Sequence, residues 1–290
     1  MKYSNPKIPE GINTSKQHPI KEFILLTGGV IGLIAIAVLV LGLFADRLAH
    51  HIPFEMEQKI ASSDLIEDSE PGPMQDYLAS LAEKIITAQD LSSEMSITVH
   101  YLDEETVNAF ATLGGHIFIY RGLIEKLPNE NSLVMVLAHE IAHIKHRHPI
   151  RSLGRGITIG LALSMVNNSL GDMMVDQIVG NTGMLTALTF SREQERKSDE
   201  TALETLISIY GNVSGADQLF EVLQASEGSL GMPEFFSTHP LSENRIQNIR
   251  DFSKQLSANA DYVETAPLPD EFEQWLSLNS ADEAEQKEDE

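Results

Sequence analysis

The sequence predicts an α+β fold that is mostly helical, with a small antiparallel sheet, preceded by one transmembrane helix. Three observations predict it. An apolar run near the N-terminus is long enough to cross a bilayer. Several later segments repeat apolar residues at helical spacing. Between those segments, two short β-prone runs flank a Gly-Gly pair, which is typical of a hairpin because glycine supplies the positive φ of tight turns.

Composition limits the function classes. The 290-residue chain has a formal net charge of −23 and no cysteine. Such an acidic protein repels phosphate backbones, so we expect no nucleic-acid partner. Without cysteine, any metal must be held by histidines and carboxylates. Part of the charge is local, with nine acidic residues and one lysine between Asp270 and Glu290. We expect residues 258–290 to form a disordered acidic tail.

The apolar run extends from Phe23 to Phe44, 22 residues without a charge. As a helix it is about 33 Å long, enough to cross a hydrocarbon core of about 30 Å. A cleaved signal peptide would have a shorter apolar region and a small-x-small cleavage site, which Leu43-Phe44-Ala45 fits badly. We therefore predict a transmembrane anchor over residues 23–45, in contact with the lipid bilayer.

Flanking charges predict the orientation of this anchor. Four lysines precede the apolar run, whereas only Arg47 and Lys59 follow it closely. The positive-inside rule then places residues 1–22 in the cytoplasm and the rest of the chain across the membrane. In a bacterium this predicts a single-pass protein of the inner (plasma) membrane with a periplasmic or extracytoplasmic domain. Gly28 and Gly32 form a small-xxx-small pair, which leaves an oligomer open.

The elements after the anchor follow from periodicity and turn residues. Residues 46–74 predict a juxtamembrane helix and a polar linker that ends in Pro-Gly-Pro. The following domain, residues 75–257, is expected to begin with a helix, a strand and the hairpin. Asn129 is a candidate cap for a central helix that ends near His148, before Pro149. The expected elements are helix 75–89, strand 97–102, hairpin 108–120, helix 129–148, a buried or interfacial helix 150–166, a loop 171–183, and helices 184–209, 214–226 and 242–256.

The central helix carries the sequence His139-Glu140-Ile-Ala-His143. Residues i and i+4 share one helical face, so both imidazoles can reach one metal ion. Glu140 lies about 100° around the helix from His139 and can activate a water without being a ligand. Zinc at a catalytic site needs a third protein ligand and an open fourth position. The histidine position of metzincins is Pro149 here, and we expect His146 to be solvated or to support a ligand.

A second helix offers the third ligand. Glu195 and Asp199 share one face of the segment that begins at Ser191. We expect Glu195 to ligate the metal and Asp199 to accept the remaining ring N–H of a ligand histidine. Glu193 and Glu200 are alternative ligands on other faces. A charged amphipathic helix would also contain such a pair, so the pair alone is weak support.

Several motifs together resemble the HtpX-like family of membrane zinc metalloproteases, the gluzincin group that includes the CAAX prenyl protease. The matching segments, in the family's order, are Asn108-Ala-Phe, Gly114-Gly115-His-Ile-Phe-Ile, Val136 to His143, Ser191 to Asp199, and Thr238-His-Pro240 followed by Arg245. The resemblance implies a zincin-like metalloprotease domain with one Zn²⁺ per chain. It implies zinc ligands at His139, His143 and Glu195, and the catalytic glutamate at Glu140. Ser198 replaces the family's usual alanine, and the chain has one clear span where HtpX has more.

The resemblance also suggests a mechanism and a substrate class. Glu140 would take the proton of the attacking water, and His239 would stabilise the oxyanion or hold the enzyme latent. We expect the strand from His116 to Tyr120 to be a sheet edge that pairs with an extended substrate, through Gly115, His116, Ile117 and Phe118. Backbone pairing suits protein or peptide substrates without a narrow code, such as unfolded or damaged membrane or envelope proteins.

Two alternatives stay open. The first is a membrane-anchored chaperone-like or interaction protein in which four protein ligands close a structural zinc site, with His239 or His146 as the fourth. Glu140 argues for an enzyme, because catalysis requires a glutamate there and a structural site does not. The second is a zinc hydrolase that acts on lipid or prenylated peptide, against which the lack of a multi-span membrane chamber counts.

Overall fold

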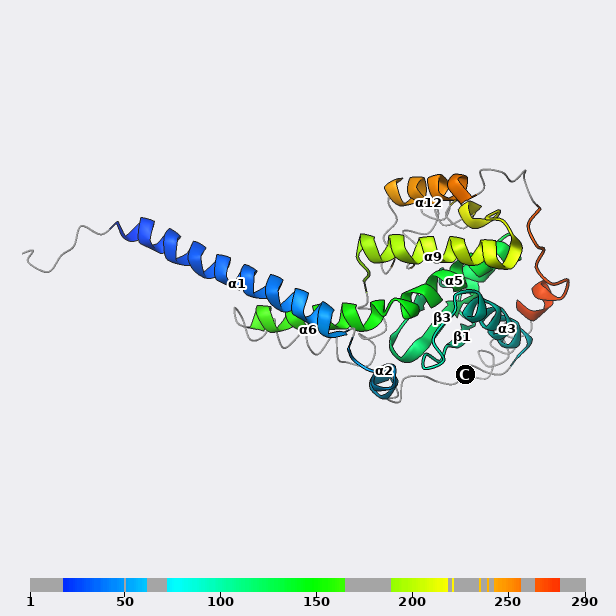
Figure 1. The fold of residues 1–290 in the computed structure, drawn as a ribbon, viewed down its shortest axis with the longest axis horizontal. Coiled ribbons are helices and arrows are strands. Elements are labelled where there is room, and N and C mark those ends of the chain that lie inside the picture. Colours follow the sequence, from blue (N-terminus) through cyan, green and yellow to red (C-terminus); the bar gives the residue numbers. More distant parts are fainter. Residues whose placement is uncertain are drawn as a thin grey trace, which may run out of the picture.

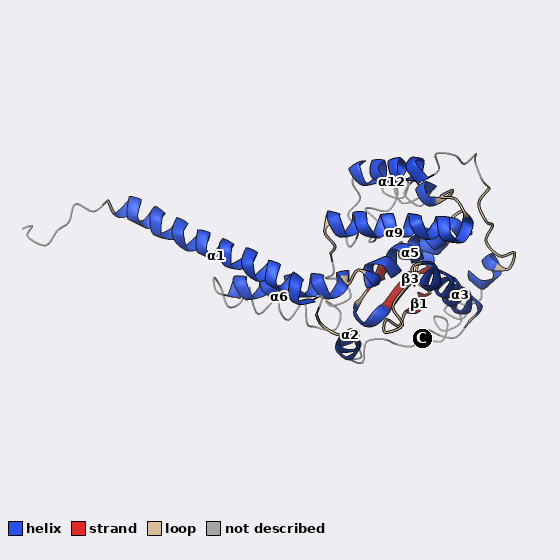
Figure 2. Cartoon of the chain, in the orientation of Figure 1, coloured by secondary structure: helices blue, strands red, loops and turns tan. Residues whose placement is uncertain are grey.

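The computed structural model describes residues 18–49, 51–61, 72–164, 189–218, 221, 235, 239, 243–256 and 264–276. Figure 1 shows the long first helix and a second helix, His148–Ser164, extending side by side from a domain that contains the other elements. Figure 2 shows that most of the described chain is helical. The elements are α1 (Pro19–Ala49), α2 (Phe54–Ala61), α3 (Pro73–Ala88), β1 (Thr98–Leu102), β2 (Ala109–Ala111), η1 (Leu113–Gly115), β3 (His116–Tyr120), α4 (Arg121–Ile124), α5 (Glu130–Lys145), α6 (His148–Ser164), α9 (Arg192–Tyr210) and α12 (Glu243–Leu256).

Helix α1 contains the predicted span. Within the described ranges it is the one helix whose length and composition would allow it to cross a membrane, over Pro19–Phe44. Its large apolar side chains, such as Leu25 and Leu33, are about 70% exposed (69% and 71%). Such exposure is unfavourable in water, so α1 requires an apolar environment that the domain does not provide.

The sheet confirms the predicted strands and hairpin but corrects the predicted antiparallel pairing. Strands β2 and β3 are antiparallel and joined through Gly114 and Gly115, whose φ angles of 75° and 88° are positive. Strand β1, however, pairs with β3 in parallel, and the order is β1-β3-β2. After the glycine turn the chain forms β3 between β1 and β2 rather than on the far side of β2. Strand β3 therefore has one parallel and one antiparallel neighbour, and the sheet is mixed.

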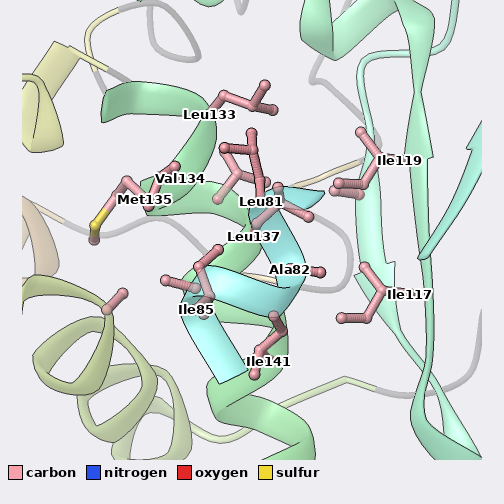
Figure 3. Close-up of a cluster of buried hydrophobic side chains, with 14 of the residues drawn as sticks. Leu81, Ala82, Ile85, Ile117, Ile119, Leu133, Val134, Met135, Leu137 and Ile141 are labelled. Atoms are coloured by element: carbon pink, nitrogen blue, oxygen red, sulfur yellow. The ribbon is translucent and has the colours of Figure 1, made fainter. Parts of the chain in front are cut away.

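Helices α3 and α5 build the core against the sheet. Figure 3 shows Ile117 and Ile119 of β3 facing Leu81 of α3 and Leu137 of α5. All four side chains are fully buried. Each contributes about 1.5–3 kcal/mol to folding. The other side of α5 packs against α9, so α5 is buried between the two layers.

Helix α5 ends earlier than predicted. Its last residue is Lys145, and Arg147 has a φ of 60°, which a right-handed helix cannot contain. Arg147 is held there because its Nε donates to Glu57 at 2.6 Å and its Nη2 donates to the Ile52 carbonyl at 2.7 Å. Pro149 then lies in the first turn of α6, where proline is well tolerated.

The predicted disordered tail is wrong for residues 264–276. Phe272 is buried in the main core, and its ring packs edge-on against Tyr77 with centroids 6.1 Å apart. Trp275 packs against the same tyrosine at 5.7 Å. The Ala266 carbonyl accepts a bond from the Glu130 amide at 3.0 Å. The many acidic residues of this segment led to the prediction of disorder, although Phe272 and Trp275 anchor it to the domain. The rest of the predicted tail, the predicted loop 171–183 and most of the predicted helix 214–226 lie outside the described residues.

Candidate metal centre

Helix α5 places two histidines on one buried face. Asn129 caps the helix by accepting from the Ser132 amide at 2.9 Å, as its sequence position predicted. One helical turn separates His139 from His143, and their ring centroids are 4.6 Å apart. Both side chains are buried, at 3% and 0% exposure. Their Nε2 atoms are 2.9 Å apart, so both rings point at the same place.

Helix α9 brings a carboxylate to this point. A capping box fixes its start, because Ser191 accepts from the Gln194 amide and the Gln194 side chain accepts from the Ser191 amide. Glu195 follows in the first turn. Its Oε2 lies 3.5 Å from His139 Nε2, and its Oε1 lies 3.4 Å from His143 Nε2.

A third histidine completes the cluster. His239 is fully buried, and its Nδ1 lies 3.3 Å from His139 Nε2 and 3.2 Å from Glu195 Oε1. One atom from each of the four side chains lies within 4.8 Å of the others. Ligands about 2.0–2.1 Å from a tetrahedral zinc ion are about 3.3 Å from one another. The measured separations therefore fit a metal of this size.

Glu140 occupies a different position in the same site. Its carboxylate is fully buried, and neither oxygen has a hydrogen-bond partner. Its Oε1 lies 3.5 Å from His239 Nε2. Burying an unpaired carboxylate costs several kcal/mol, so this group needs a compensating function. It stands beside the ligand atoms without being one of them, where it can accept a proton from a water.

An arginine and an aspartate support the ligands from behind. Asp199 Oδ1 lies 2.9 Å from His139 Nδ1, although the alignment is poor for a hydrogen bond. Arg245 donates to both Asp199 oxygens, from Nε at 2.7 Å and from Nη2 at 2.8 Å. Its Nη1 also lies 2.6 Å from Glu195 Oε2. One guanidinium therefore fixes the carboxylate of Glu195 and the carboxylate behind His139.

His143 is supported by a neutral group instead. Its Nδ1 lies 3.1 Å from Nδ1 of His148, the first residue of α6. Burial lowers the pKa of His148 to about 3, and nearby cationic groups act in the same direction. His148 is therefore uncharged at neutral pH and can accept the ring N–H of His143. His146 lies one turn from the cluster, bonds to Thr201 Oγ1 at 2.9 Å, and is half-buried.

The charges of the cluster favour cation binding. Burial alone would lower the pKa of His139, but Asp199 and Glu195 raise it to about 9. Burial would raise the pKa of Glu195, yet Arg245 and then His239 hold it well below its usual value. Arg245 likewise overcomes the effect of burial and lowers the pKa of Asp199. Both carboxylates are thus ionised, and a metal that binds His139 must displace a proton.

The alternative ligands are not brought to this point. Glu193 is exposed, and both its oxygens contact Arg196. Glu200 pairs with the same arginine on the outer face of α9.

The prediction that β3 is the sheet edge that binds substrate is wrong. Strand β3 is central, with β1 on one side and β2 on the other, so its backbone is already paired along both edges. Ile117 is buried in the core, and a Cβ at Gly115 would lie 1.9 Å from the Ser96 carbonyl oxygen. The region from Gly115 to Phe118 therefore cannot add a substrate strand. The Gly-Gly turn correctly predicts that β2 and β3 form a hairpin. It does not indicate that β1 pairs with the other edge of β3.

Two supporting residues had no role assigned from sequence. Arg245 lies 46 residues beyond Asp199, and no local pattern connects them. The motif Thr238-His-Pro240 followed by Arg245 was the one signal that marked the arginine. His148 follows His143 by five residues, a spacing that a continuous helix would turn to another face. The break at Arg147 is what returns His148 to the ligand.

Comparison with known proteins gives consistent relatives. The model of peptidase family M48 matches residues 74–253. The mitochondrial metalloendopeptidase OMA1 of Schizosaccharomyces pombe is 28% identical over 205 residues, which cover 68% of this chain and 60% of the relative. The beta-barrel assembly-enhancing protease of Escherichia coli K12 is 25% identical over 223 residues, covering 70% of this chain and 43% of the relative. The chain therefore spans about half the length of these curated relatives.

Proposed function

Because this chain belongs to peptidase family M48, we propose that it is a zinc-dependent endopeptidase, anchored in a membrane by α1, that hydrolyses unfolded or damaged proteins. The observation that carries the proposal is the buried convergence of His139, His143 and Glu195 beside the unpaired carboxylate of Glu140. A buried carboxylate with no hydrogen bond to either oxygen costs stability, and such a cost at a cluster of ionisable groups indicates a catalytic role.

We assign the metal to His139, His143 and Glu195. Two imidazoles and one carboxylate from two helices are the donors that zinc accepts at catalytic centres. When bound, zinc would polarise the scissile carbonyl and make water a stronger acid. Asp199 and Arg245 would keep the ligand atoms in place, since both carboxylates are fixed by the same guanidinium.

Glu140 is the proposed general base. It would take the proton as water attacks the carbonyl carbon, and it would then deliver that proton to the leaving amine. Neither oxygen of this carboxylate accepts a hydrogen bond from the described protein groups, so either oxygen can accept one from a water.

His239 is proposed to hold the resting site closed. Its Nδ1 lies within 3.3 Å of His139 Nε2 and within 3.2 Å of Glu195 Oε1, so it occupies the fourth position of the cluster. Substrate must displace it, after which its imidazole is near enough to stabilise the oxyanion. A permanently bound His239 would instead give a structural site in a chaperone-like protein. His239→Ala separates the two. Zinc should remain bound, and activity should rise if His239 only closes the resting site or fall if it also stabilises the oxyanion. Loss of zinc from the variant, with no cleavage by either parent or variant, would favour the structural alternative.

A substrate strand is proposed to pair with β2 rather than β3. Tyr120 donates to the Asn108 carbonyl and Thr112 donates to the His116 carbonyl, so these groups face β3. Ala109 and Ala111 alternate with these residues, so their backbone groups point to the opposite edge. Both residues are buried in this structure, at 0% and 1% exposure, so a substrate strand must displace what covers this edge. That edge belongs to the strand that packs against α5, the helix of the metal motif. Pairing through backbone reads little side-chain sequence, which suits unfolded substrates.

The location is proposed from α1. Its charge-free stretch and exposed apolar side chains suit a single pass through the inner (plasma) membrane of a bacterium, with the domain on the periplasmic side.

The substrate class is tested with one protein in two states. The full-length chain, in detergent with zinc, is incubated with a globular protein either native or permanently unfolded. Cleavage of the unfolded form alone is expected, and Glu140→Gln should cleave neither. Equal cleavage of both forms would contradict the preference for unfolded chains, and cleavage by Glu140→Gln would contradict the assigned base.

A further inference from the structure

Helix α6 lies along α1 rather than over the catalytic core. Figure 1 shows α6 leaving the domain beside the domain-proximal half of α1, and the two helices pack extensively on each other. Only the start of α6 belongs to the domain, where Ile150 and Leu153 pack with Leu113 and Phe190 in a small separate cluster. The rest of α6 therefore has α1 as its main described neighbour.

The contact falls inside the apolar span. Residues of α1 from Pro19 to Ile31 are all exposed, whereas Gly32, Ile34, Ala37, Val38 and Gly42 are half-buried. Ile34, Val38 and Gly42 follow one another at spacings of four, and Ala37 lies three residues after Ile34, so these four residues share one side of α1. All of them lie within Pro19–Phe44, the stretch able to cross a bilayer. If α1 crosses the membrane, a helix on this face is at the depth of the hydrocarbon.

Helix α6 becomes entirely uncharged toward its end, away from the domain. Arg151 and Arg155 are its charged residues, and none follows from Gly156 to the end at Ser164. Ile157 is 36% exposed despite being a large apolar residue. Gly156 and Gly160 are four residues apart, a small-xxx-small spacing that favours close packing of helices in membranes. Nine residues of helix extend about 13 Å, close to the thickness of one leaflet.

Cationic residues mark the point where both helices reach the domain. Arg47 lies near the end of α1, and Arg151 and Arg155 lie in the first half of α6. One face of the end of α1 consists of Val40, Leu43, Phe44, Arg47, Leu48 and His51. Apolar side chains next to a cation on one helix face suit the boundary between acyl chains and phosphate headgroups. This local basic character is opposite to the net charge of −23 of the chain.

We propose that α6 enters one leaflet beside α1, with Gly156–Ser164 in the hydrocarbon and Arg151 at the headgroups. Because only His146 and Arg147 separate α6 from α5, this second insertion would hold the metal cluster at the bilayer surface. Substrate segments would then be cleaved close to the membrane. The proposal rests on the anchor proposed above, and its partner is the lipid bilayer itself.

Single cysteines test the proposal cleanly, because the chain contains none. In the Glu140→Gln background, which prevents self-digestion, each of three variants carries one cysteine and an environment-sensitive fluorophore. Ile157→Cys reports α6, Leu33→Cys reports the middle of α1, and Gln247→Cys reports the exposed surface of α12. The full-length proteins are placed in vesicles of phosphatidylcholine and phosphatidylglycerol, with or without lipids that carry a quencher on the acyl chain. Unchanged zinc content verifies that each variant is folded.

The expected result is blue-shifted, lipid-quenched emission from positions 157 and 33, and water-like emission from position 247. Position 157 should be quenched more strongly by a shallow quencher, and position 33 by a deep one. Water-like emission from 157 with lipid quenching at 33 would overturn the insertion of α6 and leave the anchor intact. Water-like emission at both positions would overturn the anchor as well. Neither outcome depends on proteolysis.

Discussion

Helices α1 and α5 are both rich in apolar residues, but their surroundings are opposite. In α1 most of the large apolar side chains are exposed, among them Ile20 at 76% and Phe44 at 66%. In α5, 14 of 16 residues are buried, and these include His139, Glu140 and His143. Apolar side chains are usually buried and ionisable side chains usually exposed, and each helix departs from one of these rules. The exposed apolar surface of α1 indicates an apolar environment such as a bilayer, and the buried ionisable groups of α5 indicate a functional site. The exceptions to burial are more informative than the apolar content.

The largest effect is expected at the ligand carboxylate. Glu195→Ala removes a ligand and leaves Arg245 without one of its two carboxylates. Metal affinity should fall more than about 100-fold, because losing a residue that merely supports a ligand costs about 10–100-fold, and cleavage should stop. Competition with a chromophoric chelator measures the affinity. Glu193→Ala, on the exposed face of the same helical turn, is the matched control and should bind metal normally.

The next effect concerns the ion network behind the ligands. Arg245→Met leaves two buried carboxylates without their cation. Breaking a buried pair in this way costs about 3–5 kcal/mol. Urea unfolding of the full chain in detergent measures the change through Trp275, the single tryptophan, which packs against Tyr77. An unchanged midpoint would show that the network does not stabilise the fold.

A pair of leucine substitutions tests the comparison between the two helices directly. Leu137→Ala in α5 should reduce the free energy of unfolding by about 2–5 kcal/mol, because it opens a cavity in the core. Leu33→Ala in α1 should leave unfolding of the domain unchanged, since this side chain is 71% exposed. The same Trp275 signal serves for both variants. Equal destabilisation would mean that α1 is part of the domain's core.

A smaller effect is expected from pH. The pKa of His148 is about 3 in the folded protein, below the ordinary value of 6.5. The unfolded chain therefore takes up a proton near pH 6.5 while the folded chain does not. Stability is full above pH 6.5 and declines toward pH 3, by up to about 1.4 kcal/mol per pH unit for one such group. With chelator present to remove metal, His148→Gln should show a shallower decline than the parent.

Local sequence predicted much of the fold and the two histidines of the motif. The cap at Asn129 predicted the start of α5, and the i and i+4 spacing of His139 and His143 gave their common face. Long-range packing was not predictable from such patterns. The position of β3 between two strands, the docking of Phe272 on Tyr77 and the reach of Arg245 to Asp199 each depend on how distant segments meet. A single sequence gives no local signal for these meetings.

The central claim is that the buried cluster is a catalytic metal centre with Glu140 as its base. It is tested most directly by measuring zinc content and peptide-bond cleavage together, on the full-length parent and on Glu140→Gln. We predict one zinc per chain in both proteins. Cleavage should be lost in the variant by about 10²–10⁴-fold, the usual contribution of a general base. A parent without bound metal, or a variant that cleaves as fast as the parent, would contradict the account.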